Sequence, residues 1–326
     1  MGSIRTTLKK MVTSWTRWGT DPTNGIVVYK ASHEDGVSSG VLGILGSTLV
    51  SRGELTLQPS LLASKCASCA TAPDALRLET SISYSDTVVA VNYVIFAGSA
   101  LLDDVNGIFY PALFKVNTAP SILTGDGVEM YLDTTSVKVL DTCEGQLDAK
   151  QGRFSTFTAM TSYDGKGYVG TSGRDGDCDG CYRRAACIFM FDLGFAEGAS
   201  PTAVIALDAN LGERDVMSAT VQPAATASDK TYMFWAVGKR DGEASRIVKI
   251  EIGGSDTSSA CTSGCFRRVA SIEESFPFAG IRYIPSTGGI FAVSSSESTA
   301  TCVKYSTVVI SSVEPKYVST ATLGKS

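Results

Sequence analysis

The residues best suited to binding a metal stand together near the middle of the chain, in the sequence DGDCDG. Its three carboxylates, Asp175, Asp177 and Asp179, alternate with other residues. This D-x-D-x-D-G spacing is typical of a calcium loop, in which alternate carboxylates turn inward around a hard cation. The pattern stops there, because Arg183 and Ala186 stand where further ligands are expected. The sequence therefore leaves two interpretations, a calcium site or a solvated acidic loop.

Cysteines form the second group of chemically versatile residues, and the chain has 9 of them. Most stand in Ser-, Gly- and Asp-rich segments that are typical of exposed loops, and such pairs usually form disulfides in an oxidising compartment. Zinc is the alternative, but structural zinc sites need four ligands that often include histidine, and His33 is the only histidine. We therefore predict disulfides. The candidates are Cys66, Cys69, Cys178, Cys181, Cys187, Cys261 and Cys265.

No catalytic motif accompanies these residues. A Ser/His/Asp or Cys/His arrangement needs His33, which has no nucleophile motif around it. The sequence also lacks a Walker A loop, a dinucleotide-binding glycine motif and an HExxH motif. Glu79 and Glu129 fall in predicted strands, but their positions do not define the carboxylate pair of a glycosidase. We assign no catalytic residue and favour a protein that is not an enzyme.

The composition favours an all-β protein. Glycine is frequent, with 32 residues, only 19% of residues are charged, and short apolar segments alternate with turn residues along the 326-residue chain. A net charge of −5 argues against nucleic acid or an anionic membrane surface as the main partner. No apolar run reaches the roughly 18 residues needed for a transmembrane helix. We therefore expect neither nucleic acid nor a membrane span.

A repeated outline of strand, glycine or serine, polar loop and strand organises the chain. Its markers are Gly19, Gly98, Gly170, Gly238 and Ser294. Four-stranded antiparallel units repeated in this way are typical of a β-propeller, in which neighbouring blades bury each other's faces. A pair of β-sandwiches is the alternative. We predict a single propeller domain over residues 1–326, with five blades, or six or seven if the chain is a fragment. The expected blades are residues 11–58, 76–140, 154–207, 216–272 and 281–323.

Two segments of the first unit carry a family resemblance. They read WGTDPTNGIVVYK from Trp18 to Lys30 and LVSRGELTL from Leu49 to Leu57. They resemble the repeats of extracellular propeller proteins of the protist cell-surface and mastigoneme (flagellar hair) type. Those repeats read aromatic-Gly-Thr, a polar turn, Val-Val-Lys and then Arg-x-Gly-x-Leu-x-Leu. Tyr168-Val-Gly-Thr171 and Arg246-Ile-Val-Lys-Ile250 keep fragments of the same pattern. The resemblance implies a secreted propeller that acts in assembly, and it transfers no catalytic residue.

These observations lead to one functional hypothesis and one alternative. The hypothesis is a non-catalytic, disulfide-braced extracellular or cell-surface module that binds other protein subunits in a homo- or hetero-assembly, as part of a surface filament. No signal peptide is visible in this chain. The alternative is a propeller glycosidase or a carbohydrate-binding lectin. Trp15, Trp18 and Trp235 are its candidate sugar-stacking platform, although buried core tryptophans explain them more simply.

Overall fold

The computed structural model describes the backbone in segments, with side chains described for parts of the stretch between residues 79 and 293. The described segments are residues 15–21, 25–34, 37–45, 51–57, 75–86, 91–103, 108–117, 128–131, 155–173, 186–196, 203–207, 213, 215–226, 229–238, 245–252, 266–274, 278–295, 299–306 and 320–324.

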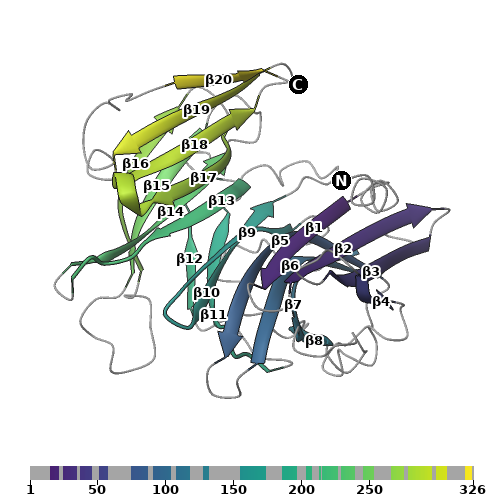
Figure 1. Cartoon of the computed structure of the whole chain (residues 1–326). Coiled ribbons are helices and arrows are strands. Elements are labelled where there is room, and N and C mark those ends of the chain that lie inside the picture. Colours follow the sequence, from purple (N-terminus) through teal and green to yellow (C-terminus); the bar gives the residue numbers. More distant parts are fainter. Residues whose placement is uncertain are drawn as a thin grey trace.

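The described strands form antiparallel groups of four, which we call units 1 to 5 (Figure 1). Unit 1 contains β1 (Trp15–Asp21), β2 (Gly25–Glu34), β3 (Val37–Leu45) and β4 (Ser51–Leu57). Unit 2 contains β5 (Ala75–Asp86), β6 (Val91–Asp103), β7 (Ile108–Asn117) and β8 (Val128–Tyr131). Unit 3 contains β9 (Ser155–Tyr163), β10 (Lys166–Gly173), β11 (Cys187–Asp192) and β12 (Ala203–Ala206). Unit 4 contains β13 (Asp215–Gln222), β14 (Thr231–Gly238), β15 (Ser245–Ile252) and β16 (Phe266–Glu274). Unit 5 contains β17 (Phe278–Ile284), β18 (Gly289–Ser295), β19 (Thr299–Ser306) and β20 (Thr320–Gly324).

Within each unit, strands that follow one another in the chain lie side by side in the sheet. Units 3 and 4 join into one eight-stranded sheet, through a single residue pair between Ser172 of β10 and Asp215 of β13. The prediction of an all-β chain built from antiparallel strands is confirmed for the described residues. No closed ring of sheets appears among them, so the number of blades stays a prediction.

The turn between β9 and β10 shows how the sequence specifies the local structure. Asp164 and Gly165 both have positive φ, at 49° and 72°. Positive φ at both central residues defines the tight hairpin turn whose twist matches that of the flanking strands, and Asp-Gly adopts it readily. Tyr163 therefore pairs directly with Lys166. The Asp164-Gly165 dipeptide thus specifies this hairpin turn.

A β-bulge recurs in the first strand of units 2 to 5. In each unit, one residue of the first strand has no direct partner in the second strand, and the register shifts at that point. The bulged residues are Glu79, Thr158, Met217 and Ala279. A bulge bends its strand and increases the local twist. The four first strands are therefore bent at equivalent positions.

The units stack through their first strands and share cores. β1 contacts β5, β5 contacts β9, β9 contacts β13, and β13 contacts β17. Each pair of neighbours from unit 2 onward buries a common hydrophobic cluster. Examples are Ile95 with Phe189 between units 2 and 3, Ile188 with Trp235 between units 3 and 4, and Phe234 with Phe278 between units 4 and 5.

Sheets covered on both faces explain the uninterrupted apolar strands. β11 reads CIFMFD, and its first five residues are all buried. β14 reads TYMFWAVG and is buried at every position except Tyr232. Alternation is lost because each face of these strands packs against a neighbouring unit, whereas a half-exposed sheet would keep it.

The repeat markers fall into two groups. Gly98, Gly170, Gly238 and Ser294 lie in β6, β10, β14 and β18, the second strand of each unit. Gly19 lies in β1, the first strand of unit 1, so its assignment to the same place is wrong. Gly-Thr occurs in both strand types, at Gly19-Thr20 and Gly170-Thr171, and that pattern alone does not distinguish them.

Gly170 is required by the contact between units 3 and 4. A Cβ at Gly170 would lie 2.5–2.9 Å from three side-chain atoms of Val216, a buried residue of β13. We predict that Gly170→Ala lowers the free energy of unfolding by roughly 1–3 kcal/mol, through overpacking, in chemical denaturation. Val216→Ala in the same chain should recover part of that loss, so the two substitutions should couple in a double-mutant cycle.

Gly280→Ala is the matched control for this prediction. It also places a methyl group on a strand at a contact between units, here on β17, but the nearest atom is Ser218 Oγ at 4.0 Å. Its stability should stay within roughly 0.5 kcal/mol of the parent chain. If Gly170→Ala costs no more than Gly280→Ala, or if the cycle shows no coupling, the described contact between β10 and β13 is wrong.

Candidate functional site

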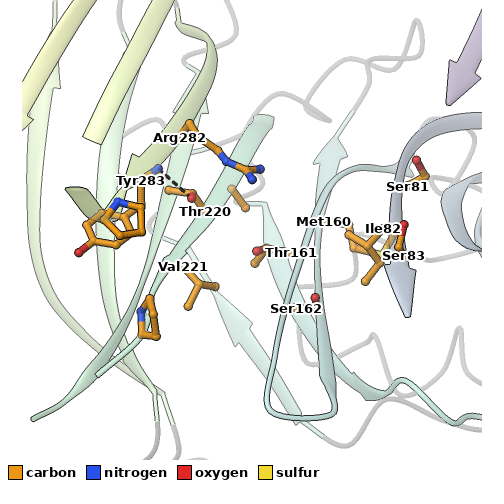
Figure 2. Close-up of a pocket in the computed structure, with 13 residues that line it drawn as sticks. Ser81, Ile82, Ser83, Met160, Thr161, Ser162, Thr220, Val221, Arg282 and Tyr283 are labelled. Carbon is orange, nitrogen blue, oxygen red and sulfur yellow. Dashed lines mark hydrogen bonds between the residues drawn. The ribbon is translucent and has the colours of Figure 1, made fainter. Parts of the chain in front are cut away.

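The first strands of units 2 to 5 surround a pocket of about 500 Å³, which we call the first-strand pocket (Figure 2). Each strand contributes residues that follow its bulge by the same small number of positions. The lining residues are 81–83 of β5, 160–162 of β9, 219–221 of β13 and 282–283 of β17, together with Pro223 and Pro285. The repeated bulge therefore places equivalent segments of four units around one space.

Hydroxyl groups join neighbouring units beside this pocket, and one of them, that of Thr220, also lines it. The Ile281 N–H donates to Ser218 Oγ at 3.1 Å, and the Tyr283 N–H donates to Thr220 Oγ1 at 3.0 Å. Thr158 Oγ1 of β9 donates to the carbonyl of Val216 in β13. First strands of different units make no continuous ladder with each other, so their backbone groups need side-chain partners. Serine and threonine supply them here.

Arg282 is the only charged residue among those that line the pocket. Its side chain is exposed, and within the described residues it makes no hydrogen bond or ion pair. Figure 2 shows its guanidinium extending from β17 toward the space bordered by Thr161 of β9. A guanidinium presents five N–H donors in a rigid fork that matches carboxylate and phosphate groups. The pocket thus combines one unpaired cation with a neutral wall.

The residues predicted for calcium lie outside the described residues, as do most of the cysteines. These are Asp175, Asp177, Asp179, Cys66, Cys69, Cys178, Cys181, Cys261 and Cys265. Within the described part of the chain, no group of three or more His, Cys, Asp and Glu residues is arranged to hold a metal ion. The calcium site and the full disulfide pairing stay predictions.

Cys187 is the candidate cysteine that the structure describes. It begins β11, is almost fully buried, and its N–H donates to Thr171 Oγ1 at 2.9 Å. Its sulfur is disulfide-bonded. This bond lies where the long polar loop after β10 rejoins the sheet.

The other candidates from the sequence do not converge on the pocket. Trp235 is fully buried in the core between units 3 and 4, so it is a core tryptophan and not a platform for sugars. Trp15, Trp18, His33 and Glu129 belong to strands whose side chains at these positions lie outside the described set. No described helix is long and apolar enough to cross a membrane.

Two buried lysines, which the sequence analysis did not single out, lie over aromatic rings in equivalent strands. Lys115 of β7 has its Nζ 4.8 Å from the Tyr93 ring centroid, and Lys249 of β15 has its Nζ 4.0 Å from that of Tyr232. Burial lowers the pKa of Lys249, while the nearby Glu251 carboxylate acts in the opposite direction. Cation–π contact compensates part of the desolvation of such an ammonium. Lys249, which belongs to the Arg246–Ile250 fragment of the repeat pattern, therefore has a structural role here.

Comparison with known proteins gives no family. No protein-family model and no curated protein sequence matches the chain. Similar solved structures include the Dos1 propeller, with 8% identity, a TM-score of 0.46 and coverage of 94% of this chain and 59% of that one. A protein from Lactobacillus plantarum has 10% identity and a TM-score of 0.49, covering 93% and 69% of the two chains. The periplasmic gluconolactonase of Pseudomonas aeruginosa has 10% identity and a TM-score of 0.42, covering 95% and 85%. At these identities and TM-scores the likeness assigns neither a fold family nor a function to this chain.

Proposed function

We propose that residues 1–326 form a single five-bladed β-propeller that acts as a non-catalytic structural or interaction module. Units 1 to 5 are its blades, the first strands are the innermost strands, and the first-strand pocket lies on the ring axis. The contact of each first strand with the next along the chain supports this arrangement. Shared cores between successive units support it further, because a blade cannot bury both faces alone.

The observation that carries the proposal is the set of hydroxyl hydrogen bonds that join neighbouring units beside the pocket. Ser218, Thr220 and Thr158 are hydrogen-bonded to the backbone of neighbouring units. Such bonds fix the position of each unit against the next and make the stack rigid. A rigid scaffold that carries long loops is well suited to binding a partner, because loops held by such a scaffold present their residues in fixed positions. The proposed partners are other protein subunits, in a homo- or hetero-assembly such as a surface filament.

The proposed location is extracellular or at the cell surface. The disulfide at Cys187 supports it, because disulfides persist in oxidising compartments and are rare in the cytosol. Cys187 follows the segment that also holds the aspartates proposed for calcium. Paired cysteines in the other loops would brace the remaining long connections in the same way.

Counting free thiols tests this proposal. Native protein from a secretory host is alkylated without reduction, digested and mapped by mass spectrometry. We expect most of the 9 cysteines to be protected and an odd, small number to react. Cys187→Ser should expose one further reactive thiol, which identifies the partner of Cys187. Nine reactive thiols in native material would contradict the extracellular, disulfide-braced module.

A further inference from the structure

We propose that the first-strand pocket binds a small polyhydroxylated anion, such as a sugar acid or a sugar phosphate, and that Arg282 binds its charged group. This goes beyond the role in assembly and does not depend on it. The pocket volume of about 500 Å³ lies in the range of small-molecule sites, which is roughly 300–1,000 Å³.

The backbone that carries Arg282 is held on both sides. Its two chain neighbours, Ile281 and Tyr283, donate their N–H groups to Ser218 Oγ and Thr220 Oγ1 of β13. The residue between these two hydrogen bonds cannot shift along the strand without breaking them. The backbone position of Arg282 at the pocket is therefore fixed before any ligand binds. This lowers the entropy cost of ordering the site on binding.

The charge of Arg282 is available to a ligand. Within the described residues no carboxylate pairs with it, and the lining residues include no aspartate or glutamate. By contrast, the exposed Lys230 and the half-exposed Lys166 pair with Glu251 and Asp192. An arginine without an anionic partner at a concave, polar site favours an anion that it can bind through two N–H donors.

The wall opposite Arg282 suits the rest of such a ligand. Ser83 of β5 and Thr161 and Ser162 of β9 bring hydroxyl groups, which both donate and accept hydrogen bonds. Ile82 of β5 and Val221 of β13 add apolar surface to the pocket. A sugar has hydroxyl groups at its edge and C–H groups on its faces. The alternation of hydroxyl and aliphatic side chains around this pocket matches that chemistry.

Titration calorimetry with three probes tests the inference: glucuronate, glucose 6-phosphate and glucose. We expect at least one of the two anions to bind, glucose to bind more weakly, and the affinity to fall as salt is added. Arg282→Gln should weaken anion binding roughly 10- to 100-fold, as expected for a lost charge-assisted pair. Arg282→Lys should retain part of the affinity, because it keeps the charge but not the fork. Preference for the carboxylate or the phosphate identifies the charged group of the ligand.

Lys230→Gln is the matched control, because it removes one positive charge from an exposed side chain that does not line the pocket. It should leave binding unchanged. Arg282 is exposed, so Arg282→Gln should keep the melting temperature of the parent chain. The inference is overturned if no probe binds at millimolar concentration, if glucose binds as well as the anions, or if Arg282→Gln and Lys230→Gln have equal effects. None of these outcomes changes the thiol count or the assembly state, so the binding inference can fail while the proposed function stands.

Discussion

Arg246→Leu should lower the free energy of unfolding by about 3–5 kcal/mol, which is the usual cost of breaking a buried ion pair from one side. Arg246 Nε lies 3.6 Å from Oε1 of Glu213, whose side chain is only 1% exposed. This distance makes an ion pair and not a hydrogen bond. The backbone carbonyl of Glu213 also accepts a hydrogen bond from Ala186, at the junction of units 3 and 4. Removing the guanidinium leaves a buried carboxylate at that junction without its facing cation.

Two further variants show whether the burial of Glu213 causes the large stability loss expected for Arg246→Leu. Glu273 also pairs with Arg246, but its side chain is 43% exposed. Glu273→Gln should therefore cost no more than about 1 kcal/mol, as surface pairs do. Combining Arg246→Leu with Glu213→Leu should recover most of the stability, since replacing both partners with apolar groups is often neutral. Urea denaturation of the four chains gives the comparison. Equal losses for Arg246→Leu and Glu273→Gln would rule out a buried pair.

Trp235→Ala should lower the free energy of unfolding by a similar amount, about 3–5 kcal/mol, because it leaves a large cavity in a shared core. Trp235 is fully buried in β14 and packs in the cluster that joins units 3 and 4. Its neighbours there include Ile188 of unit 3 and Val248 of β15. The loss should appear in the same denaturation measurement, as a lower midpoint with little change in slope.

Trp235→Phe is the informative companion. The indole Nε1 of Trp235 is buried, and no residue in the described part of the chain accepts a hydrogen bond from it. Phenylalanine removes that unsatisfied donor while keeping most of the aromatic surface. Trp235→Phe should therefore lower the free energy of unfolding clearly less than Trp235→Ala does. If Trp235→Ala leaves stability unchanged, the tryptophan is not a core residue, and a role as an exposed stacking platform returns.

Local features of the fold could be predicted from the sequence. The Asp164-Gly165 turn follows from the φ angles that this dipeptide adopts readily. β11 and β14 follow from apolar runs too short and too rich in aromatic or β-branched residues for helices. The turn and the two strands depend on residues that are adjacent in the chain, so the local sequence pattern predicts them.

The site could not be predicted in the same way. The bulges at Glu79 and Thr158 depend on the register between strands, which no local pattern specifies. Arg282 stands in an ordinary strand sequence, GIRYIP. It becomes a candidate binding residue only because three other strands line the same pocket. Glu213 stands in a connection between units, and its burial depends on Arg246 of a later strand.

An X-ray crystal structure of the chain, purified with its disulfides intact, tests the propeller proposal most directly. The described contacts run from β1 through β5, β9 and β13 to β17. We predict that the ring closes, with unit 5 packed against unit 1 and all five first strands around the axis that contains the first-strand pocket. Arg282 should then face that axis. Two separate β-sandwiches, or an open stack with β1 and β17 at opposite ends, would contradict the proposal.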